Sequence, residues 1–372
     1  MFNLRLKQLQ KRVVNPILIK KKANLFYLTG RHFDYRSDEY LLVTKKNVIG
    51  FGSGLEQIDW IKKYDRLKNI GQYLKGNKLD IEYGFTFGEG KYLSAKVKGL
   101  RAKPVKSLVD EMRQVKDVVE LSNVRKSMQI VEKVFTLVKS QIRKKLWTER
   151  GLAEFIIKMG YKFGAEDIAF PAIVASGVNA AIPHHVPTSK FLKSGESIII
   201  DFGFKYKNYC SDFTRTIFLK SVPKKLEVAY NQVEKAYNQS IKFISNFAED
   251  DPLQSRGSSS KVIAGRVYDY AVKILKEANL DKYFIHSLGH GTGLEIHELP
   301  NLSPNSRDRL ENGMIFSIEP GVYIPKLGGI RIEDLVYLSR SESPSDFAIR
   351  GLENVKVKKF INVSTKLKDN IL

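Results

Sequence analysis

In the first 110 residues, short apolar runs alternate with stretches in which apolar residues recur at helical spacing. The runs LFYLTG, EYLLVTKKNVIGFG and LDIEYGFTF are rich in aromatic and aliphatic residues and predict strands. The stretch GLEQIDWIKKYDRLKNIGQYLKG has apolar residues at helical intervals and predicts a helix. This alternation predicts a small α/β domain over residues 1–110.

From residue 111 to residue 372 the pattern changes to long helices and hairpins, without a regular strand–helix–strand period. An amphipathic pattern over 108–145 predicts a long helix with one interruption, near the start of the second domain. Further helices are expected at 148–164, 223–247 and 265–280, and strands at 196–204, 209–219, 313–324 and 329–338. This mixture favours an α+β domain over 111–372. The polar tract 248–260 contains proline and glycine and predicts a loop.

Composition and charge restrict the class of protein. Hydrophobic residues make up 43% of the chain, and no apolar run approaches the length of about 18 residues that a membrane helix needs. A single cysteine, Cys210, permits no disulfide within the chain, and the first residues lack a secretory signal, so we expect a cytoplasmic protein without membrane partners. The net charge is +22, but the lysines are spread along the chain, which does not favour a nucleic-acid partner.

Two acidic residues flank the predicted hairpin IIIDFGFKYKNYCSDFTRT. If this hairpin turns at Tyr206 and Lys207, Asp201 lies directly opposite Asp212, since both are equidistant from the turn. Opposed side chains of a hairpin lie about 5 Å apart on one face, and two like charges there destabilise the pair. A divalent cation between the carboxylates would compensate. The alternative is a pair of exposed aspartates on a solvated hairpin.

The segment SIEPGVYIPKLGGIRIED repeats this arrangement. Glu319 and Glu333 are equidistant from Lys326, which lies in a Pro-Lys-Leu-Gly-Gly turn, so a hairpin brings two more carboxylates face to face. Two such pairs at apolar strand positions are harder to explain by chance than one. Four carboxylates and a neutral imidazole nearly cancel two divalent cations, which is the charge balance of a dinuclear hydrolase that activates a water molecule.

Histidines are concentrated in the same part of the chain. The segment HSLGHGTGLEIHE, residues 286–298, holds three of the six histidines, and His184 and His185 lie in SGVNAAIPHHVPTSK. One histidine of the cluster would supply a nitrogen ligand, and the others could donate hydrogen bonds to a substrate carbonyl or a developing oxyanion. A lone histidine is more often a core or surface residue, but this concentration favours chemistry.

These motifs resemble the metallopeptidase superfamily of methionine aminopeptidase, prolidase and aminopeptidase P, which has the pita-bread fold. DFG and YCSDFTRT, HSLGHGTGLEIHE, SIEPGVYIP and GIRIEDLV occur in the order typical of that superfamily, over roughly 110–360. Residues 1–110 resemble the creatinase-type N-terminal domain of the Xaa-Pro members. The resemblance implies two divalent metal ions (Mn, Co or Zn, of which Mn is favoured) with five ligands: Asp201, Asp212, His290, Glu319 and Glu333.

The resemblance also implies roles for residues around the metal ions. His184 and His297 match donors that stabilise the tetrahedral intermediate, and Glu319 matches a ligand that also moves a proton from the bridging water. Three residues are expected to bind substrate or to support the metal carboxylates: His286 in the proline-side pocket, Tyr323 and Arg331.

Other features of this region receive no catalytic role. His185 is expected to have a loop role, because many relatives have glycine there, and Cys210 is expected to pack in the interior. The tract 248–260 is longer and more polar than is typical of the family, and it contains no expected ligand.

The expected activity is metal-dependent hydrolysis of the Xaa-Pro bond at the N-terminus of dipeptides or short peptides, by a homodimer. Methionine aminopeptidase-like activity is the alternative within the enzyme class. A non-catalytic member of the fold that binds nucleic acid or protein is the alternative outside it, and the complete ligand set argues against that alternative.

Overall fold

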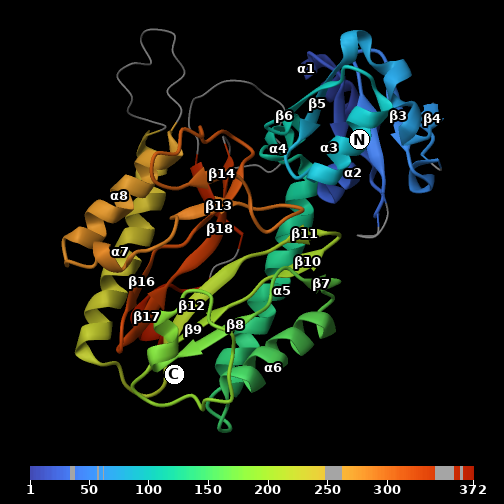
Figure 1. Ribbon diagram of the computed structural model, residues 1–372. Coiled ribbons are helices and arrows are strands. Elements are labelled where there is room, and N and C mark those ends of the chain that lie inside the picture. Colours follow the sequence, from blue (N-terminus) through green and yellow to red (C-terminus); the bar gives the residue numbers. More distant parts are fainter. Residues whose placement is uncertain (34–37, 57, 62, 248–261, 340–355, 361–362) are drawn as a thin grey trace. The chain divides into compact units, whose positions relative to one another are not determined.

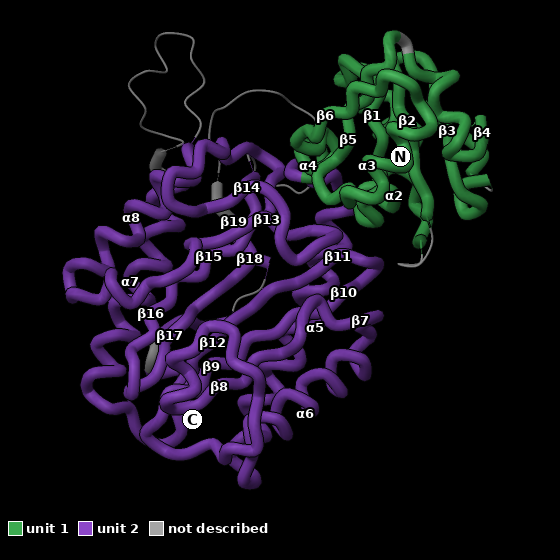
Figure 2. The backbone as a smooth tube through the Cα atoms, viewed as in Figure 1, with its two compact units in different colours: residues 1–113 green, residues 114–372 purple. Residues whose placement is uncertain are grey.

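The computed structural model describes residues 1–33, 38–56, 58–61, 63–247, 262–339, 356–360 and 363–372. The chain forms two compact units, residues 1–113 and residues 114–372 (Figure 2). The tract 248–260, predicted to be a loop, lies outside the described residues. In the part of the chain that is described, no helix combines the length and apolar character needed to cross a membrane.

The first unit contains a six-stranded mixed sheet in the order β4-β3-β2-β1-β5-β6. Figure 1 labels the strands of its two sides, β3 and β4 on one and β5 and β6 on the other. Its strands are β1 Ile17–Ile19, β2 Tyr40–Val43, β3 Val48–Phe51, β4 Lys63–Asp65, β5 Lys78–Glu82 and β6 Arg101–Val105. Its helices are α1 Phe2–Arg12, α2 Lys22–Thr29, α3 Phe87–Lys96 and α4 Leu108–Arg113. The apolar core of the sheet includes residues of β1, β2, β3, β5 and α3.

Two local predictions in this unit are wrong. The run LFYLTG forms most of α2, which ends at Gly30 with a left-handed φ of 73°. A short apolar run fits a buried helix or a strand equally well, so its pattern alone could not decide. The helix predicted from residue 54 to residue 76 is replaced by β4 and 3-10 turns. Asp65 accepts hydrogen bonds from Asn69 Nδ2 at 2.7 Å and Tyr73 Oη at 2.8 Å, and these bonds stabilise the turns.

The second unit is built on an eight-stranded sheet in the order β14-β13-β15-β18-β12-β9-β8, with β19 paired to β18. Its strands are β8 Ile173–Ser176, β9 Ser197–Asp201, β12 Phe213–Phe218, β13 Gly289–Gly291, β14 Glu298–Leu302, β15 Ile315–Ile318, β18 Glu333–Ser339 and β19 Lys356–Lys359. Two smaller sheets contain β7 Asp167–Ile168 with β10 Phe204–Tyr206 and β11 Tyr209–Cys210, and β16 Gly321–Ile324 with β17 Gly328–Arg331.

Two pairs of helices bury the two faces of this sheet: α5 Val118–Gln141 with α6 Glu149–Lys162, and α7 Lys224–Phe247 with α8 Ala264–Lys276. Side chains of β18 alternate between the faces, because successive residues of a strand point in opposite directions. Leu335 and Tyr337 pack in the apolar cluster that includes α5 and α6, whereas Val336 and Leu338 pack in the cluster that includes α7 and α8. The predicted α+β class is confirmed.

The long helical pattern over 108–145 is interrupted once, as predicted. Helix α4 ends at Arg113, and α5 begins after Asp117. The Asp117 side chain caps α5 by accepting hydrogen bonds from the backbone N–H groups of Val119 and Glu120. The cap therefore fixes where the second long helix starts.

Candidate metal centre

The first acidic hairpin has a different register from the predicted one. Its turn lies at Lys207 and Asn208, whose φ values are 47° and 70°, one residue later than expected. Asp201 consequently pairs with Thr214, so the predicted direct opposition of Asp201 and Asp212 is wrong. Asparagine tolerates the left-handed conformation of a tight hairpin turn, which explains the shift. A register change of two residues preserves the side-chain face, and both aspartates still line one cavity.

The second acidic hairpin has the predicted register. The pairing of β16 with β17 and the pairing of β15 with β18 share one register, centred on Lys326. Ile318 pairs with Asp334, so the next residue toward the turn, Glu319, lies across from Glu333. Two carboxylates from opposite sides of this hairpin therefore meet as expected.

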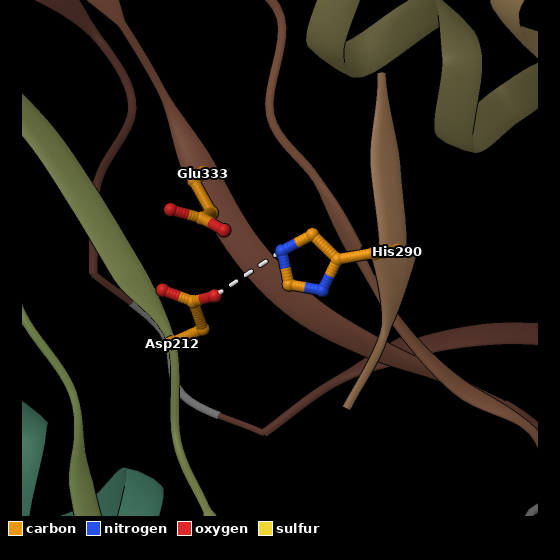
Figure 3. A group of neighbouring side chains, drawn as sticks. All are labelled: Asp212, His290 and Glu333. Atoms are coloured by element: carbon orange, nitrogen blue, oxygen red, sulfur yellow. Dashed lines mark ion pairs between the residues drawn. The ribbon is translucent and has the colours of Figure 1, made fainter. Parts of the chain in front are cut away.

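Asp212, His290 and Glu333 form a group that could hold a metal ion (Figure 3). One ligand atom of each residue lies within 4.8 Å of those of the other two. His290 Nε2 also lies 3.5 Å from Asp212 Oδ2 and 3.3 Å from Glu319 Oε1. The residues come from distant parts of the sequence, and they meet because β13, β15, β18 and β12 are successive neighbours in the sheet.

The buried carboxylates of this centre repel one another. Asp212 is 4% exposed and Glu333 is 2% exposed. Burial, followed by the charges of neighbouring carboxylates, raises the pKa of Asp212 and the pKa of Glu333 well above their usual values. Burial is also the largest cause of the raised pKa of Glu319. A bound divalent cation would stabilise the ionised forms, so this donor set fits a metal ion.

Asp201 contributes a carboxylate oxygen without a partner. Its Oδ2 accepts a hydrogen bond from Arg331 Nη2 at 2.5 Å. Its Oδ1 is buried and has no hydrogen-bond partner among the described residues. A buried unpaired oxygen is costly, and a cation in the shared cavity would satisfy it. Two independent observations, the repelling carboxylates and this oxygen, therefore fit a divalent metal centre.

A hydrogen-bonded chain connects Asp201 to His286 through Arg331 and Tyr323. Arg331 Nη1 donates to Tyr323 Oη at 2.6 Å, and Tyr323 Oη lies 2.9 Å from His286 Nε2. His286 Nδ1 lies 2.7 Å from the Ser287 carbonyl oxygen, which can only accept, so Nδ1 carries the proton. Burial lowers the pKa of His286 and favours the neutral ring, in which Nε2 accepts from Tyr323. His286 therefore presents its ring, rather than a free nitrogen, to the cavity.

The expected site residues, with the exception of Tyr323, line one cavity of about 530 Å³. The His297 ring centroid lies 4.3 Å from that of His290, and burial lowers the pKa of His297. His184 is exposed at a turn on the rim of the same lining. Tyr323 is buried behind Arg331 and reaches the site only through its hydrogen bonds. Apolar residues complete the lining: Phe170, Pro171, Ala172, Ile173, Pro183, Val186, Pro187 and Ile296.

Hydroxyl groups that no motif indicated orient two of the carboxylates. Thr214 Oγ1 donates to Glu333 Oε2 at 2.7 Å, and Ser317 Oγ donates to Glu319 Oε1 at 3.0 Å. Cys210 is buried, and burial raises the pKa of its thiol to about 12. It therefore remains protonated at neutral pH, in agreement with the packing role expected for it.

Glu149 is a buried carboxylate outside the metal ligands, and the sequence did not single it out. Its side chain is 0% exposed and accepts hydrogen bonds from Ser176, Asn179, Thr188 and His185 Nε2, the last at 2.9 Å. Burial opposes ionisation, but these hydrogen bonds together lower the pKa of Glu149 to about 2. The available signal was an acidic residue after the N-cap of α6, which is usual in a first helical turn.

Comparisons with known proteins agree with this site. Residues 122–340 match metallopeptidase family M24. The chain is 31% identical over 346 residues to a Xaa-Pro dipeptidase of Pyrococcus horikoshii, covering 90% of this chain and 93% of the relative. It is 32% identical over 352 residues to a putative Xaa-Pro aminopeptidase of Mycoplasma pneumoniae, covering 91% and 93%.

The structure is similar to prolidase from Pyrococcus furiosus, with a TM-score of 0.79 at 28% identity, covering 96% of this chain and 99% of the other. This similarity confirms the predicted pita-bread fold. Together with the buried Asp-His-Glu group, the matches over most of the chain lead to one conclusion. The chain belongs to metallopeptidase family M24.

Proposed function

We propose that this protein hydrolyses the peptide bond between an N-terminal residue and proline, in dipeptides or short peptides. The observation that carries the proposal is the buried group of carboxylates and one imidazole in a cavity of about 530 Å³. Relatives named Xaa-Pro dipeptidase and Xaa-Pro aminopeptidase support the choice of bond. Family membership supports divalent metal binding.

Asp201, Asp212, His290, Glu319 and Glu333 would hold two divalent ions, with Mn favoured because carboxylate ligands suit hard cations. Ions bound there would polarise the scissile carbonyl. They would also lower the pKa of a water molecule, so that it can lose a proton and attack the carbonyl carbon at neutral pH. Proton transfer in the reaction is assigned to a side chain of the site. Glu319 takes the proton of the attacking water and delivers it to the proline nitrogen as the C–N bond breaks.

The histidines around these ligands act on the substrate. His297 and His184 donate hydrogen bonds to the carbonyl oxygen as it becomes an oxyanion. His286, whose two nitrogens are engaged by Ser287 and Tyr323, provides a ring surface for the proline. Arg331 holds the Asp201 carboxylate in place through its 2.5 Å hydrogen bond.

Specificity for proline is supported by the apolar part of the cavity lining. Phe170, Pro171, Ile173 and Ile296 offer side chains against which the pyrrolidine ring of proline can pack. Proline also lacks the N–H that an ordinary second residue would bring into the cavity, so its nitrogen requires no acceptor.

Four peptides at equal metal loading test the activity: Met-Pro, Met-Pro-Ala, Met-Ala and Met-Ala-Ser. We expect the proline peptides to be hydrolysed much faster than the alanine peptides. Faster cleavage of the alanine peptides would identify a methionine aminopeptidase-like activity instead. Elemental analysis of the same samples should find about two divalent ions per chain, as a dinuclear hydrolytic site requires.

The remaining features of the proposal concern the whole protein. We propose a homodimer in the cytoplasm, with residues 1–110 as a creatinase-like N-terminal domain. The relatives that match over nine-tenths of the chain support this domain assignment. Analytical ultracentrifugation should give the mass of two chains, and a mass of 42.4 kDa would contradict the dimer.

A further inference from the structure

The cavity offers a substrate carboxylate no uncommitted arginine or lysine among its described lining residues. Arg331 is the lining residue with such a cation. Its Nη2 donates to Asp201, its Nη1 donates to Tyr323 and to the Pro183 carbonyl, and its Nε donates to Thr214. A dipeptide that ends in proline carries a free carboxylate one residue from the scissile bond. This charge requires a partner if the dipeptide is to bind well.

His185 is a lining residue with a nitrogen available for that carboxylate. Its Nε2 lies 2.9 Å from Glu149 Oε2, and an ionised carboxylate can only accept, so Nε2 carries a proton. Its Nδ1 has no hydrogen-bond partner in the described part of the chain and is not among the buried unpaired atoms. Glu149 therefore fixes the His185 ring through Nε2, and Nδ1 is left to make a further contact.

Glu149 places a buried carboxylate directly behind the His185 ring. Its oxygens also accept hydrogen bonds from Ser176 at 2.8 Å and Thr188 at 2.7 Å, which hold the carboxylate in place. A ring held through Nε2 in this way presents Nδ1, and not Nε2, to a bound ligand. Lys190, a cation near His185 in the sequence, is engaged by Ser176 and Glu196 and is not among the residues that line the cavity.

We propose that His185, held by Glu149, binds the free C-terminal carboxylate of an Xaa-Pro dipeptide through Nδ1–H. His185 is then a specificity-determining residue that favours dipeptides over substrates whose proline carbonyl is blocked. This inference rests on the proposed function and specifies the substrate class of the same site.

The substitution His185→Gln tests this role, because glutamine keeps a donor for Glu149 but carries no charge. Steady-state kinetics are measured with Ala-Pro and with Ala-Pro-amide, which lacks the carboxylate, at saturating Mn²⁺. We expect KM for Ala-Pro to rise about 10- to 100-fold, as for the loss of a hydrogen bond between charged groups. Ala-Pro-amide should change by no more than about twofold, since it never makes the charged contact. His32→Gln, in the first unit, is the matched control and should leave both substrates unchanged.

A purely structural role for His185 would lower kcat/KM equally for both substrates, and that result would overturn the inference. An independent measurement uses the wild-type protein: free proline should inhibit more tightly than prolinamide, and equal inhibition would contradict the carboxylate contact. The proposed function fails separately, if the wild-type protein cleaves neither Ala-Pro, Ala-Pro-amide nor Ala-Pro-Ala. Cleavage of all three with unchanged ratios in His185→Gln rejects only the role of His185.

Discussion

Asp212 and Glu333 are acidic side chains kept almost fully away from water, 4% and 2% exposed. Their raised pKa values mean that ionising them in the metal-free protein destabilises the folded state. When a carboxyl group has a higher pKa in the folded state than in the unfolded state, the free energy of unfolding falls as the pH rises above the unfolded pKa. The two buried carboxylates therefore do not stabilise the metal-free protein, and metal binding accounts for their position.

Asp212→Asn should have opposite effects on stability and on activity. It removes one repelling charge, so the melting temperature of the metal-free protein at pH 7 should rise by a few degrees. It also removes a ligand, so bound metal and turnover should fall sharply. Calorimetry in EDTA, elemental analysis and a peptide assay measure the three quantities. A variant that keeps full metal content and full activity would contradict the assignment of Asp212.

His297→Ala should separate substrate chemistry from metal binding. The ring is next to His290 but is not part of the Asp-His-Glu group. We expect the metal content to stay at the wild-type level and kcat to fall by about 100- to 1,000-fold, as when one oxyanion donor is removed. His184→Ala should behave alike. Loss of metal with normal turnover per bound ion would show that the assigned roles are wrong.

At the scale of elements, Glu149 connects helix α6 to the segment that carries His184. It accepts hydrogen bonds from Ser176 at the end of β8 and from Thr188 beyond the histidine turn. One buried carboxylate thus fixes both ends of the 176–188 segment, whose middle lines the cavity. The position of His184 therefore depends on a residue outside the site itself.

Glu149→Gln should reduce stability in a pH-dependent way. The pKa of Glu149 falls from an ordinary 4.5 to about 2 in the folded protein. This difference contributes about 3 kcal/mol at neutral pH, fully present above pH 5 and lost as the pH falls toward 2. Urea unfolding at pH 7 should show most of that loss in the variant, and unfolding at pH 3 should show less.

Glu154→Gln is the matched control, because Glu154 lies on the same helix but is exposed. Its free energy of unfolding should stay within about 0.5 kcal/mol of wild type at both pH values. An equal loss in both variants, or a loss in Glu149→Gln that does not shrink with acidity, would contradict the role given to Glu149.

At the scale of the whole molecule, metal binding should stabilise the folded chain. The candidate ligands come from residues 201 to 333 and meet only when the second unit is folded, so the unfolded chain has no comparable site. Metal at 100 times its dissociation constant should add about 2.7 kcal/mol to the free energy of unfolding. Calorimetry with EDTA and after addition of Mn²⁺ measures this gain. Asp212→Asn should lose most of it, and an undiminished gain in that variant would place the metal elsewhere.

The local sequence pattern by itself determined several helices and one hairpin register of this protein. The helices of the second unit follow from apolar periodicity, because a 3.6-residue period is visible in sequence alone. The opposition of Glu319 and Glu333 follows from counting residues about Lys326, since a hairpin with a short turn fixes its own register. Short apolar runs in the first unit were not determined in this way, because a buried helix and a strand share such a pattern, and LFYLTG forms most of α2.

Tertiary structure alone decided what no local pattern encodes. Asp201 pairs with Thr214 because Lys207 and Asn208 adopt left-handed conformations. Asn208 favours that conformation, but a turn without glycine leaves its partner residue, and so the register, undetermined by sequence. Glu149 accepts hydrogen bonds from Ser176 and Thr188, which lie 27 and 39 positions further along the chain. It also engages His185 Nε2, which leaves Nδ1 as the nitrogen available to a ligand. Such contacts depend on how helices and sheets pack, because burial and hydrogen-bond partners are properties of the folded chain rather than of its period.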